Sequence, residues 1–339
     1  MTADPHAFEL RLADAVRRDP ALRHRLAARL EMLAPDVIWC EQPFLWPLVA
    51  PLAESKAITV VYSGHNVEWR ARRELLARLG RTAPAIVERL ATLERALIAR
   101  ADLVIGCSEA DAAGYRAMGA TSVALVPNGA DPPVAGDNSD AAALARLQAR
   151  LDPGLPVLAF IGADYLPNWI GLRDLVVTSM APGGALAGFQ LLLMGEVCRP
   201  YADWLRQRGG AMPQIHALGR VDAATRSAAF RLADVAILPL TTGGGTSLKT
   251  AEALLGMSEV VGTPIAFRGH KERTGAPGVH CVAPDAFAAG LAALDLTDRD
   301  AIRARAGARR PEVAGCSWDA VLAAAAADPA IGAVLRVAR

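Results

Sequence analysis

Apolar and polar positions repeat along the chain with two periods, one typical of helices and one typical of strands. Leucine and valine side chains recur at near-helical spacing from Arg11 to Leu33, which predicts an amphipathic helix bent at Pro20. Further helical stretches separate short apolar runs that are rich in β-branched residues and bounded by turn formers. These runs predict four strands in the first part of the chain, at residues 37–40, 58–63, 103–105 and 123–126.

A change of composition divides the chain into two domains. Residues 135–152 are expected to link a domain of residues 1–134 to one of residues 153–315, with a C-terminal helical segment at 316–339. The strand–helix alternation restarts after the linker with almost continuously apolar strands, which are typical of parallel sheets covered on both faces. The pattern predicts the α/β class with doubly wound parallel sheets. Six strands are expected in the second domain, at 157–162, 189–195, 215–219, 235–238, 260–267 and 279–282.

Composition and charge exclude several classes of protein. The 36 Lys and Arg against 35 Asp and Glu give a net charge of +1, so no nucleic-acid partner is expected. The five cysteines stand singly, so neither a zinc site nor a disulfide framework is expected, and buried free thiols are. No apolar run reaches the roughly 18 residues of a membrane-spanning helix, and the N-terminus lacks a signal-peptide core. We expect a cytoplasmic protein.

The segment after the strand at 235–238 is the most informative one. It carries the glycines Gly243–Gly245, and a helix is expected to begin at Thr246. Glycines allow a ligand to approach the backbone closely, and a helix N-terminus attracts negative charge. Lys249 adds a cation, and the carboxylate of Glu252 suits ribose hydroxyls. The segment therefore predicts a phosphate cradle. It is not a Walker A loop, since no glycine precedes the lysine, and a tight turn with solvated side chains is the alternative.

Two other strand ends carry candidate residues, because ligands bind beyond the carboxyl ends of parallel strands. His65 follows the strand at 58–63, and a structural and a functional role stay equally open for it. Asn66 is expected to cap the helix that follows. Gly162 opens the loop after the first strand of the second domain, where the alternative is a plain turn in which Asn168 caps the next helix.

Several motifs occur in the order found in GT-B glycosyltransferases of family 4, and the chain resembles that family from about Ala34 to about Ala323. In the first part, His65-Asn66-Val67-Glu68 resembles the family's HN-x-E motif. In the second part the resemblance lies in Gly162 with Pro167-Asn168, Met194-Gly195-Glu196, Leu218-Gly219-Arg220-Val221, and the Gly-rich loop to Leu254.

This resemblance implies two Rossmann-like domains that face a cleft, and a metal-independent, retaining reaction without a cofactor. It implies that Glu252, the second glutamate of an E-x7-E motif, holds the ribose of a nucleoside-diphosphate sugar. Lys249 would face the diphosphate, and His65 would reach the donor from the first domain. Further donor contacts are implied for Gly162, Gly219, Val221, Gly244, Gly245, Thr246 and Ser247.

The sequence departs from the family's pattern in both domains. Gly244 stands where many members have the first glutamate of the E-x7-E motif. The Arg and Lys that usually follow the first strand of the second domain are absent, so Lys249 is expected to substitute for them. The first domain lacks the opening strand and Gly-rich acceptor loop, which indicates a shortened acceptor side or a truncated chain.

We therefore expect a retaining glycosyltransferase of polysaccharide biosynthesis that acts on a glycan or lipid-linked acceptor. One alternative is a catalytically impaired nucleotide-sugar-binding module, and a lesser one is a nucleotide-sugar epimerase, for which no acid–base pair is evident. Peripheral contact with the anionic inner face of a membrane is also expected, with a solvated helix as the alternative. The basic segment behind that expectation carries Arg70, Arg72, Arg73, Arg78 and Arg81.

Overall fold

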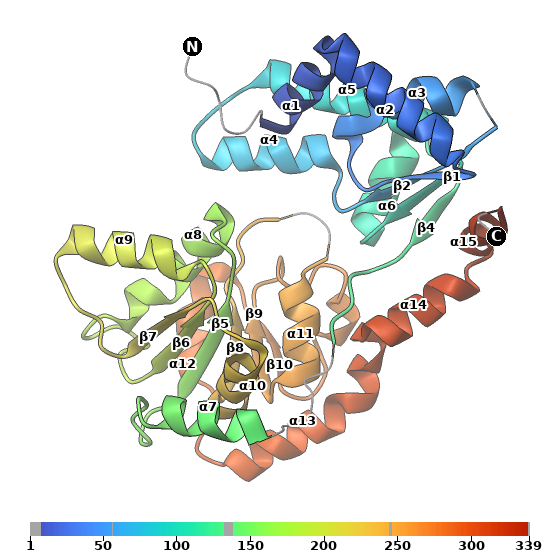
Figure 1. The fold of residues 1–339 in the computed structure, drawn as a ribbon. Coiled ribbons are helices and arrows are strands. Elements are labelled where there is room, and N and C mark those ends of the chain that lie inside the picture. The colour runs from blue at the N-terminus through green and yellow to red at the C-terminus, as the bar shows by residue number, and fades with distance from the viewer. Residues whose placement is uncertain (1–7, 56, 132–137, 244–245, 338–339) are drawn as a thin grey trace. The chain divides into compact units, whose positions relative to one another are not determined.

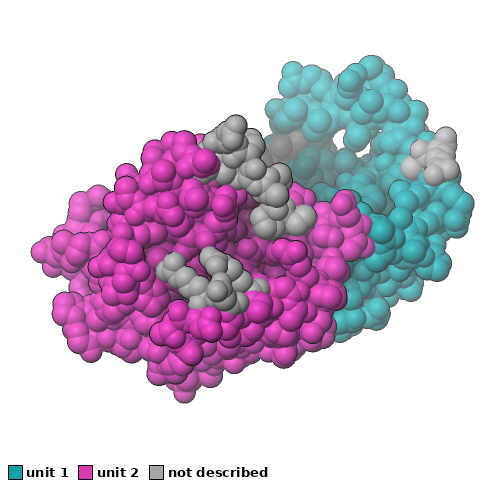
Figure 2. Space-filling model, turned by 90° about the horizontal axis from the view of Figure 1, so that it is seen from below, with its two compact units in different colours: residues 1–127, 244–246, 321–339 teal, residues 128–243, 247–320 magenta. Residues whose placement is uncertain are grey.

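The computed structural model describes residues 8–55, 57–131, 138–243 and 246–337 (Figure 1). The chain divides into two compact units, coloured separately in Figure 2. Unit 1 comprises residues 1–127, 244–246 and 321–339, and unit 2 comprises residues 128–243 and 247–320. Each unit contains a sheet of parallel strands with helices, which confirms the predicted α/β class.

Unit 1 is built on a four-stranded parallel sheet in the order β1-β2-β3-β4. Its strands are β1 (Val37–Cys40), β2 (Thr59–Gly64), β3 (Leu103–Gly106) and β4 (Val123–Leu125), at the four predicted places. Cys40 pairs with Tyr62, so the carboxyl ends of β1 and β2 lie beside each other. The helices are α1 (Phe8–Arg18), α2 (Pro20–Leu33), α3 (Trp46–Ser55), α4 (Glu68–Arg78), α5 (Pro84–Arg100), α6 (Glu109–Ala117) and α15 (Pro329–Val337).

Both faces of this sheet are apolar, because successive side chains of a strand point to opposite faces. Val60 of β2 packs in one cluster with Leu97 of α5. Its neighbour Val61 packs in another, with Ile331 and Val334 of α15. The last helix of the chain therefore completes the core of unit 1.

Unit 2 contains a six-stranded parallel sheet in the order β10-β9-β8-β5-β6-β7. The order reverses between β5 and β8, and such a switch point is where α/β sheets bind ligands. The strands are β5 (Val157–Ile161), β6 (Gln190–Met194), β7 (Ile215–Gly219), β8 (Val235–Leu238), β9 (Glu259–Gly262) and β10 (Val279–Cys281). The helices are α7 (Asn138–Gln148), α8 (Leu166–Leu175), α9 (Cys198–Arg208), α10 (Ala223–Leu232), α11 (Leu248–Gly256), α12 (Phe287–Ala292) and α13 (Arg299–Val313), while α14 (Trp318–Ala327) runs across the division between the units.

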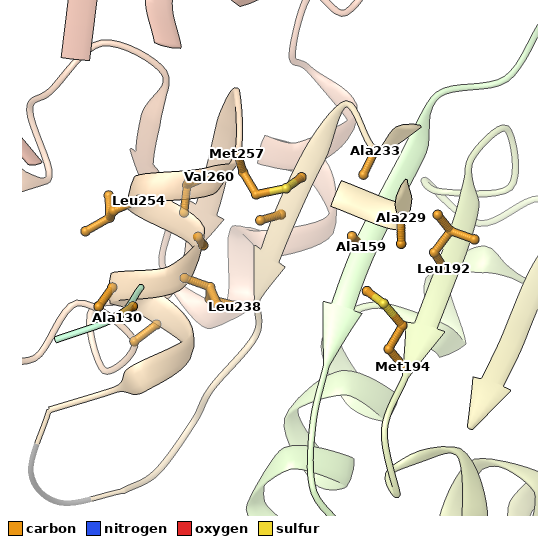
Figure 3. Close-up of a cluster of buried hydrophobic side chains, with 14 of the residues drawn as sticks. Ala130, Ala159, Leu192, Met194, Ala229, Ala233, Leu238, Leu254, Met257 and Val260 are labelled. Atoms are coloured by element: carbon orange, nitrogen blue, oxygen red, sulfur yellow. The ribbon is translucent and has the colours of Figure 1, made fainter. Parts of the chain in front are cut away.

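Small side chains let α10 approach the sheet of unit 2. Ala229 of this helix and Ala233, its C-cap, belong to the same buried cluster as Ala159 of β5 and Leu192 of β6 (Figure 3). The cluster continues under α11, where Leu254 is buried. This packing fixes α10 and also α11, which carries Lys249 and Glu252.

Several predicted boundaries are wrong. The strand expected at 260–267 ends at Gly262, because Ala266 and Phe267 donate backbone hydrogen bonds to the carbonyl oxygen of Thr263 and form a turn. The single bent helix expected up to Leu33 is two helices, since the side chain of Asp19 caps α2. The expectation of buried free thiols holds only for Cys316, since Cys281 is exposed and the other three cysteines are half-buried.

The two units divide the chain at other places than the predicted domains. Unit 2 starts at Asn128, because α7 packs against α10 and buries Ala143 and Leu147 in the core of that unit. Unit 1 regains the chain at Val321, because α15 packs on β3 and β4. The local composition, on which the predicted domain boundaries rested, indicates neither the packing of α7 on α10 nor that of α15 on β3 and β4.

Candidate functional site

The Gly-rich loop leads from β8 to α11 at the switch point of the unit 2 sheet. The helix begins at Leu248, two residues later than predicted, with Ser247 as its N-cap. Gly243 has a φ of +143°, a conformation that favours glycine. Thr246 is buried. Gly244 and Gly245, which the sequence analysis assigned to the donor, lie outside the described residues.

Lys249 connects the loops that follow β5 and β8. Its Nζ atom donates a hydrogen bond of 2.6 Å to Oδ1 of Asn168 and lies 5.6 Å from the ring centroid of Phe160. Burial lowers the pKa of Lys249 to about 8, although the neighbouring carboxylate of Glu252 raises it. Lys249 is therefore a half-buried cation at neutral pH and is held at the head of α11.

Asn168 positions this lysine and does not cap a helix. The predicted capping role is wrong, because α8 already begins at Leu166 and has Tyr165 as its N-cap. Asn168 lies in the first turn, is 5% exposed, and donates from Nδ2 to the carbonyl oxygen of Ala163 at 3.1 Å. That bond orients the amide so that its oxygen faces Lys249.

Glu252 lies one turn further along α11 and is paired with an arginine that the sequence analysis did not single out. Its Oε1 atom accepts a 2.8 Å hydrogen bond from Arg226 of α10, and its side chain is 22% exposed. Burial raises the pKa of Glu252, whereas Arg226 and Lys249 lower it. A carboxylate held in this way offers acceptor oxygens to hydroxyl groups.

Two glycines, Gly162 and Gly195, let the backbone segments at the ends of β5 and β6 approach each other closely. A Cβ atom on Gly195, whose φ is +89°, would stand 2.3 Å from the carbonyl oxygen of Gly162. That oxygen accepts the N–H of Val197 at 3.0 Å. Gly162, a predicted donor contact, is thus fixed by backbone contacts beside Asn168.

A cavity of about 260 Å³ lies beside the end of β7. Val221 and Leu218 line it, together with Thr225 of α10. Gly219, with a φ of +69°, accepts the N–H of Gly195 at 2.6 Å. Thr225 directly precedes Arg226, so α10 runs from this cavity to the partner of Glu252. The cavity therefore borders the helix that also carries Arg226, the partner of Glu252.

In unit 1, His65 forms a pair with Glu41. His65 Nε2 lies 2.8 Å from Glu41 Oε2, and the side chains are 56% and 58% exposed. The other carboxylate oxygen of Glu41 accepts a 2.8 Å hydrogen bond from the indole of Trp39. His65 is therefore not a core histidine but an exposed one, held at the joint carboxyl edge of β1 and β2.

A buried carboxylate fixes the helix that follows His65. Asn66 is not the N-cap as predicted, since α4 begins at Glu68 and Val67 holds the cap position. Instead, Oε1 of Glu94 accepts the backbone N–H of Glu68 at 3.0 Å and the hydroxyl of Tyr62 at 2.9 Å. Glu94 is fully buried, and burial raises its pKa to about 7 despite these donors.

Two partners of the predicted site residues escaped the sequence analysis: Glu94 and Arg226. Glu41 and Asn168 had a signal in the sequence, because each lies in a segment that follows a predicted strand. Glu94 and Arg226 lie on helices, where nothing local distinguishes them from solvated residues.

Within the described ranges, no group of three or more His, Cys, Asp or Glu side chains could hold a metal ion. No single helix of those ranges is long and apolar enough to cross a membrane, although α14 and α15, bent by 82°, meet the criteria of length and composition as a pair.

Comparison with family models gives a match in each half of the chain. Residues 2–133 match the model of Glycosyltransferase Family 4, and residues 156–295 match the model of Glycosyl transferases group 1. No curated protein matches the sequence.

Solved structures share the fold at low sequence identity. Sucrose-phosphate synthase from Thermosynechococcus elongatus is 17% identical, with a TM-score of 0.69 over 94% of this chain and 77% of that one. The α,α-trehalose 6-phosphate synthase from Burkholderia multivorans is 15% identical, with a TM-score of 0.63 over 99% and 79%. Anabaena HepE, solved with UDP and glucose, is 17% identical, with a TM-score of 0.65 over 93% and 80%. These likenesses show the GT-B fold.

Proposed function

Because the chain belongs to the family 4, group 1 glycosyltransferases of the GT-B fold, we propose that it transfers a sugar from a nucleoside diphosphate with retention of configuration. The observation that carries the proposal is the placement of Lys249 and Glu252 on the first two turns of α11, behind the Gly-rich loop. The related Anabaena structure contains UDP and glucose, which supports a nucleotide-sugar donor.

The donor would extend along unit 2 from the Gly-rich loop to the cavity beside β7. Lys249 and the first N–H groups of α11 face the diphosphate, and the pair of Glu252 and Arg226 holds the ribose. The cavity of about 260 Å³ next to Val221 takes the base. Gly162, Gly219, Thr246 and Ser247 supply backbone contacts, as do Gly244 and Gly245.

In the reaction, the bond between the anomeric carbon and the diphosphate oxygen breaks, and the acceptor hydroxyl oxygen bonds to that carbon on the same face. The acceptor proton passes to the departing phosphate. Negative charge grows on the diphosphate in the transition state, where Lys249 and the amides of α11 stabilise it without a resident metal or cofactor. His65, held by Glu41, acts on the sugar during turnover.

The acceptor in this proposal is a glycan or a lipid-linked glycan bound by unit 1 at the inner face of a membrane. The basic helix α4 is a weak candidate for the membrane contact, because Arg72 pairs with Glu9 and Arg73 stacks on Trp69. Helix α2 is a better one. It buries none of its residues and exposes three apolar side chains among its arginines: Leu26, Met32 and Leu33. Flotation with anionic vesicles, and no flotation with neutral ones, would support this contact.

A thermal-shift screen with UDP-, GDP-, TDP- and ADP-sugars tests the donor, since a ligand that binds only the native state raises its stability. The substitution Glu252→Gln should reduce the shift given by the responding sugar, and Glu312→Gln, a change of an exposed glutamate, should not. The anomeric proton signal of the transfer product then shows whether configuration is retained. Binding without any product would favour the impaired binding module.

A further inference from the structure

Arg268 lies against the Gly-rich loop and directly follows the segment that was expected to be a strand. A Cβ atom built on Gly243 would stand 2.8 Å from one guanidinium nitrogen of Arg268 and 3.4 Å from its Cζ atom. The guanidinium therefore packs directly on the loop backbone, where glycine alone leaves room for it. Its other terminal nitrogen donates a 2.7 Å hydrogen bond to the carbonyl oxygen of Ile265.

The turn that carries Arg268 is fixed to both elements that flank the loop. The hydroxyl of Thr263 donates to the carbonyl oxygen of Leu240, just after β8. The fully buried hydroxyl of Thr250, in α11, donates to the carbonyl oxygen of Ala266 at 2.6 Å. These bonds hold Arg268 in register with the loop, so its position beside Gly243 is built into the fold.

The loop contains a further polar group that calls for a partner. Oγ1 of Thr242, one residue before Gly243, is buried and has no hydrogen-bond partner among the described residues. Buried hydroxyls are normally satisfied, and the hydroxyl of Thr242 could donate to an acceptor oxygen of a ligand bound at the loop.

A diphosphate carries more than one negative charge, so Lys249 alone does not neutralise it. Lys249 is bonded to Asn168, and burial lowers its pKa to about 8. A guanidinium keeps its charge at all relevant pH values and binds phosphate oxygens in a fork.

We propose that Arg268 binds the terminal phosphate of the nucleoside diphosphate. This inference rests on the proposed function and deepens it. Glu252, the proposed ribose contact, lies on the second turn of α11, and Lys249 lies on the first turn. Gly243 precedes the helix, so the phosphate farthest from the ribose is placed beside Gly243. Arg268 then supplies, from the loop after β9, the charge that the loop after β5 lacks.

The test compares nucleoside diphosphates with monophosphates by calorimetry, using UDP and UMP, GDP and GMP, and ADP and AMP as probes. For the pair that binds, Arg268→Gln should lower the affinity for the diphosphate about 10- to 100-fold. The affinity for the monophosphate should stay within about threefold of the wild-type value. The diphosphate affinity of Arg268→Lys should lie between those of the wild type and Arg268→Gln. Gly243→Ala, which displaces the guanidinium while keeping its charge, should act like Arg268→Gln. Arg206→Gln is the matched control, since Arg206 is 74% exposed on α9 and pairs with Asp203.

Melting temperatures establish that each variant is folded. Unchanged diphosphate affinity in folded Arg268→Gln would overturn the inference. Equal losses for diphosphate and monophosphate would also overturn it, because Arg268 would then only support the loop. If the wild-type protein binds none of the diphosphates, the proposed function itself fails, and this outcome is distinct from the other two.

Discussion

Lys249 is the residue on which the proposed chemistry depends most. Its pKa is lowered to about 8 by burial, and a lysine is a cation only below its pKa. Diphosphate affinity should therefore fall as the pH rises from 7.5 to 9. Lys249→Arg should remove this pH dependence, because a guanidinium stays protonated.

Lys249→Ala should weaken binding of the responding nucleoside diphosphate by about 1.5–3 kcal/mol at pH 7.5, the size of a charge-assisted hydrogen bond. Calorimetric titration of the three proteins at both pH values checks the expectation. If Lys249→Ala bound the diphosphate as tightly as the wild type, Lys249 would have no contact with it.

His65 presents a different kind of test, since the structure places it on the surface with Glu41. A residue used chiefly in the transition state lowers kcat when it is removed and leaves donor affinity nearly intact. We expect His65→Ala to reduce kcat on the order of 100-fold with little change in melting temperature. Turnover, donor affinity and melting temperature measured on one preparation decide it, and full turnover would refute the catalytic role.

At the scale of the element, α4 depends on the buried carboxyl group of Glu94. Burial raises its pKa to about 7 in the folded protein, whereas the ordinary value is 4.5. The folded state therefore keeps a proton that the unfolded state releases, and the stability gained from it is present below pH 4.5 and lost as the pH rises through 7.

Glu94→Gln keeps an oxygen for Glu68 and Tyr62 and carries no charge. It should gain stability over the wild type as the pH rises from 5 to 8, by on the order of 3 kcal/mol. Chemical denaturation of both proteins at the two pH values measures the difference. A constant difference would mean that Glu94 ionises normally.

At the scale of the whole molecule, the chain returns to unit 1 after building unit 2. Ile331 and Val334 of α15 are 7% and 8% exposed against the sheet of unit 1. Ile331→Ala should destabilise unit 1 by about 2–4 kcal/mol, the usual cost of emptying a buried site. Leu335→Ala on the same helix is the control, because Leu335 is 46% exposed.

Hydrogen exchange distinguishes a local from a global effect of Ile331→Ala. Exchange should accelerate in β3 and β4, while the sheet of unit 2 and its nucleotide affinity stay unchanged. Equal acceleration in both sheets would show that the two units unfold together.

The sequence alone determined the strands, the class of fold and the loops that matter. Strand positions are encoded locally, in runs such as Val157–Ile161 and Val235–Leu238, so apolar periodicity finds them without knowledge of their neighbours. The parallel arrangement of the strands, and the expectation that ligands bind beyond their carboxyl ends, then follow from general rules. On this basis Lys249, Glu252 and His65 could be chosen as candidates.

Only the tertiary structure decided which side chains meet. Lys249 and Asn168 are 81 positions apart, and they touch because β5 and β8 are neighbours in a sheet whose order reverses there. Arg268 reaches Gly243 for a related reason, since β8 and β9 pair. Strand order depends on packing across the entire chain, whereas a local pattern reports only the conformation of its own segment. The partners that tune and complete the candidate site therefore became visible only in the folded protein.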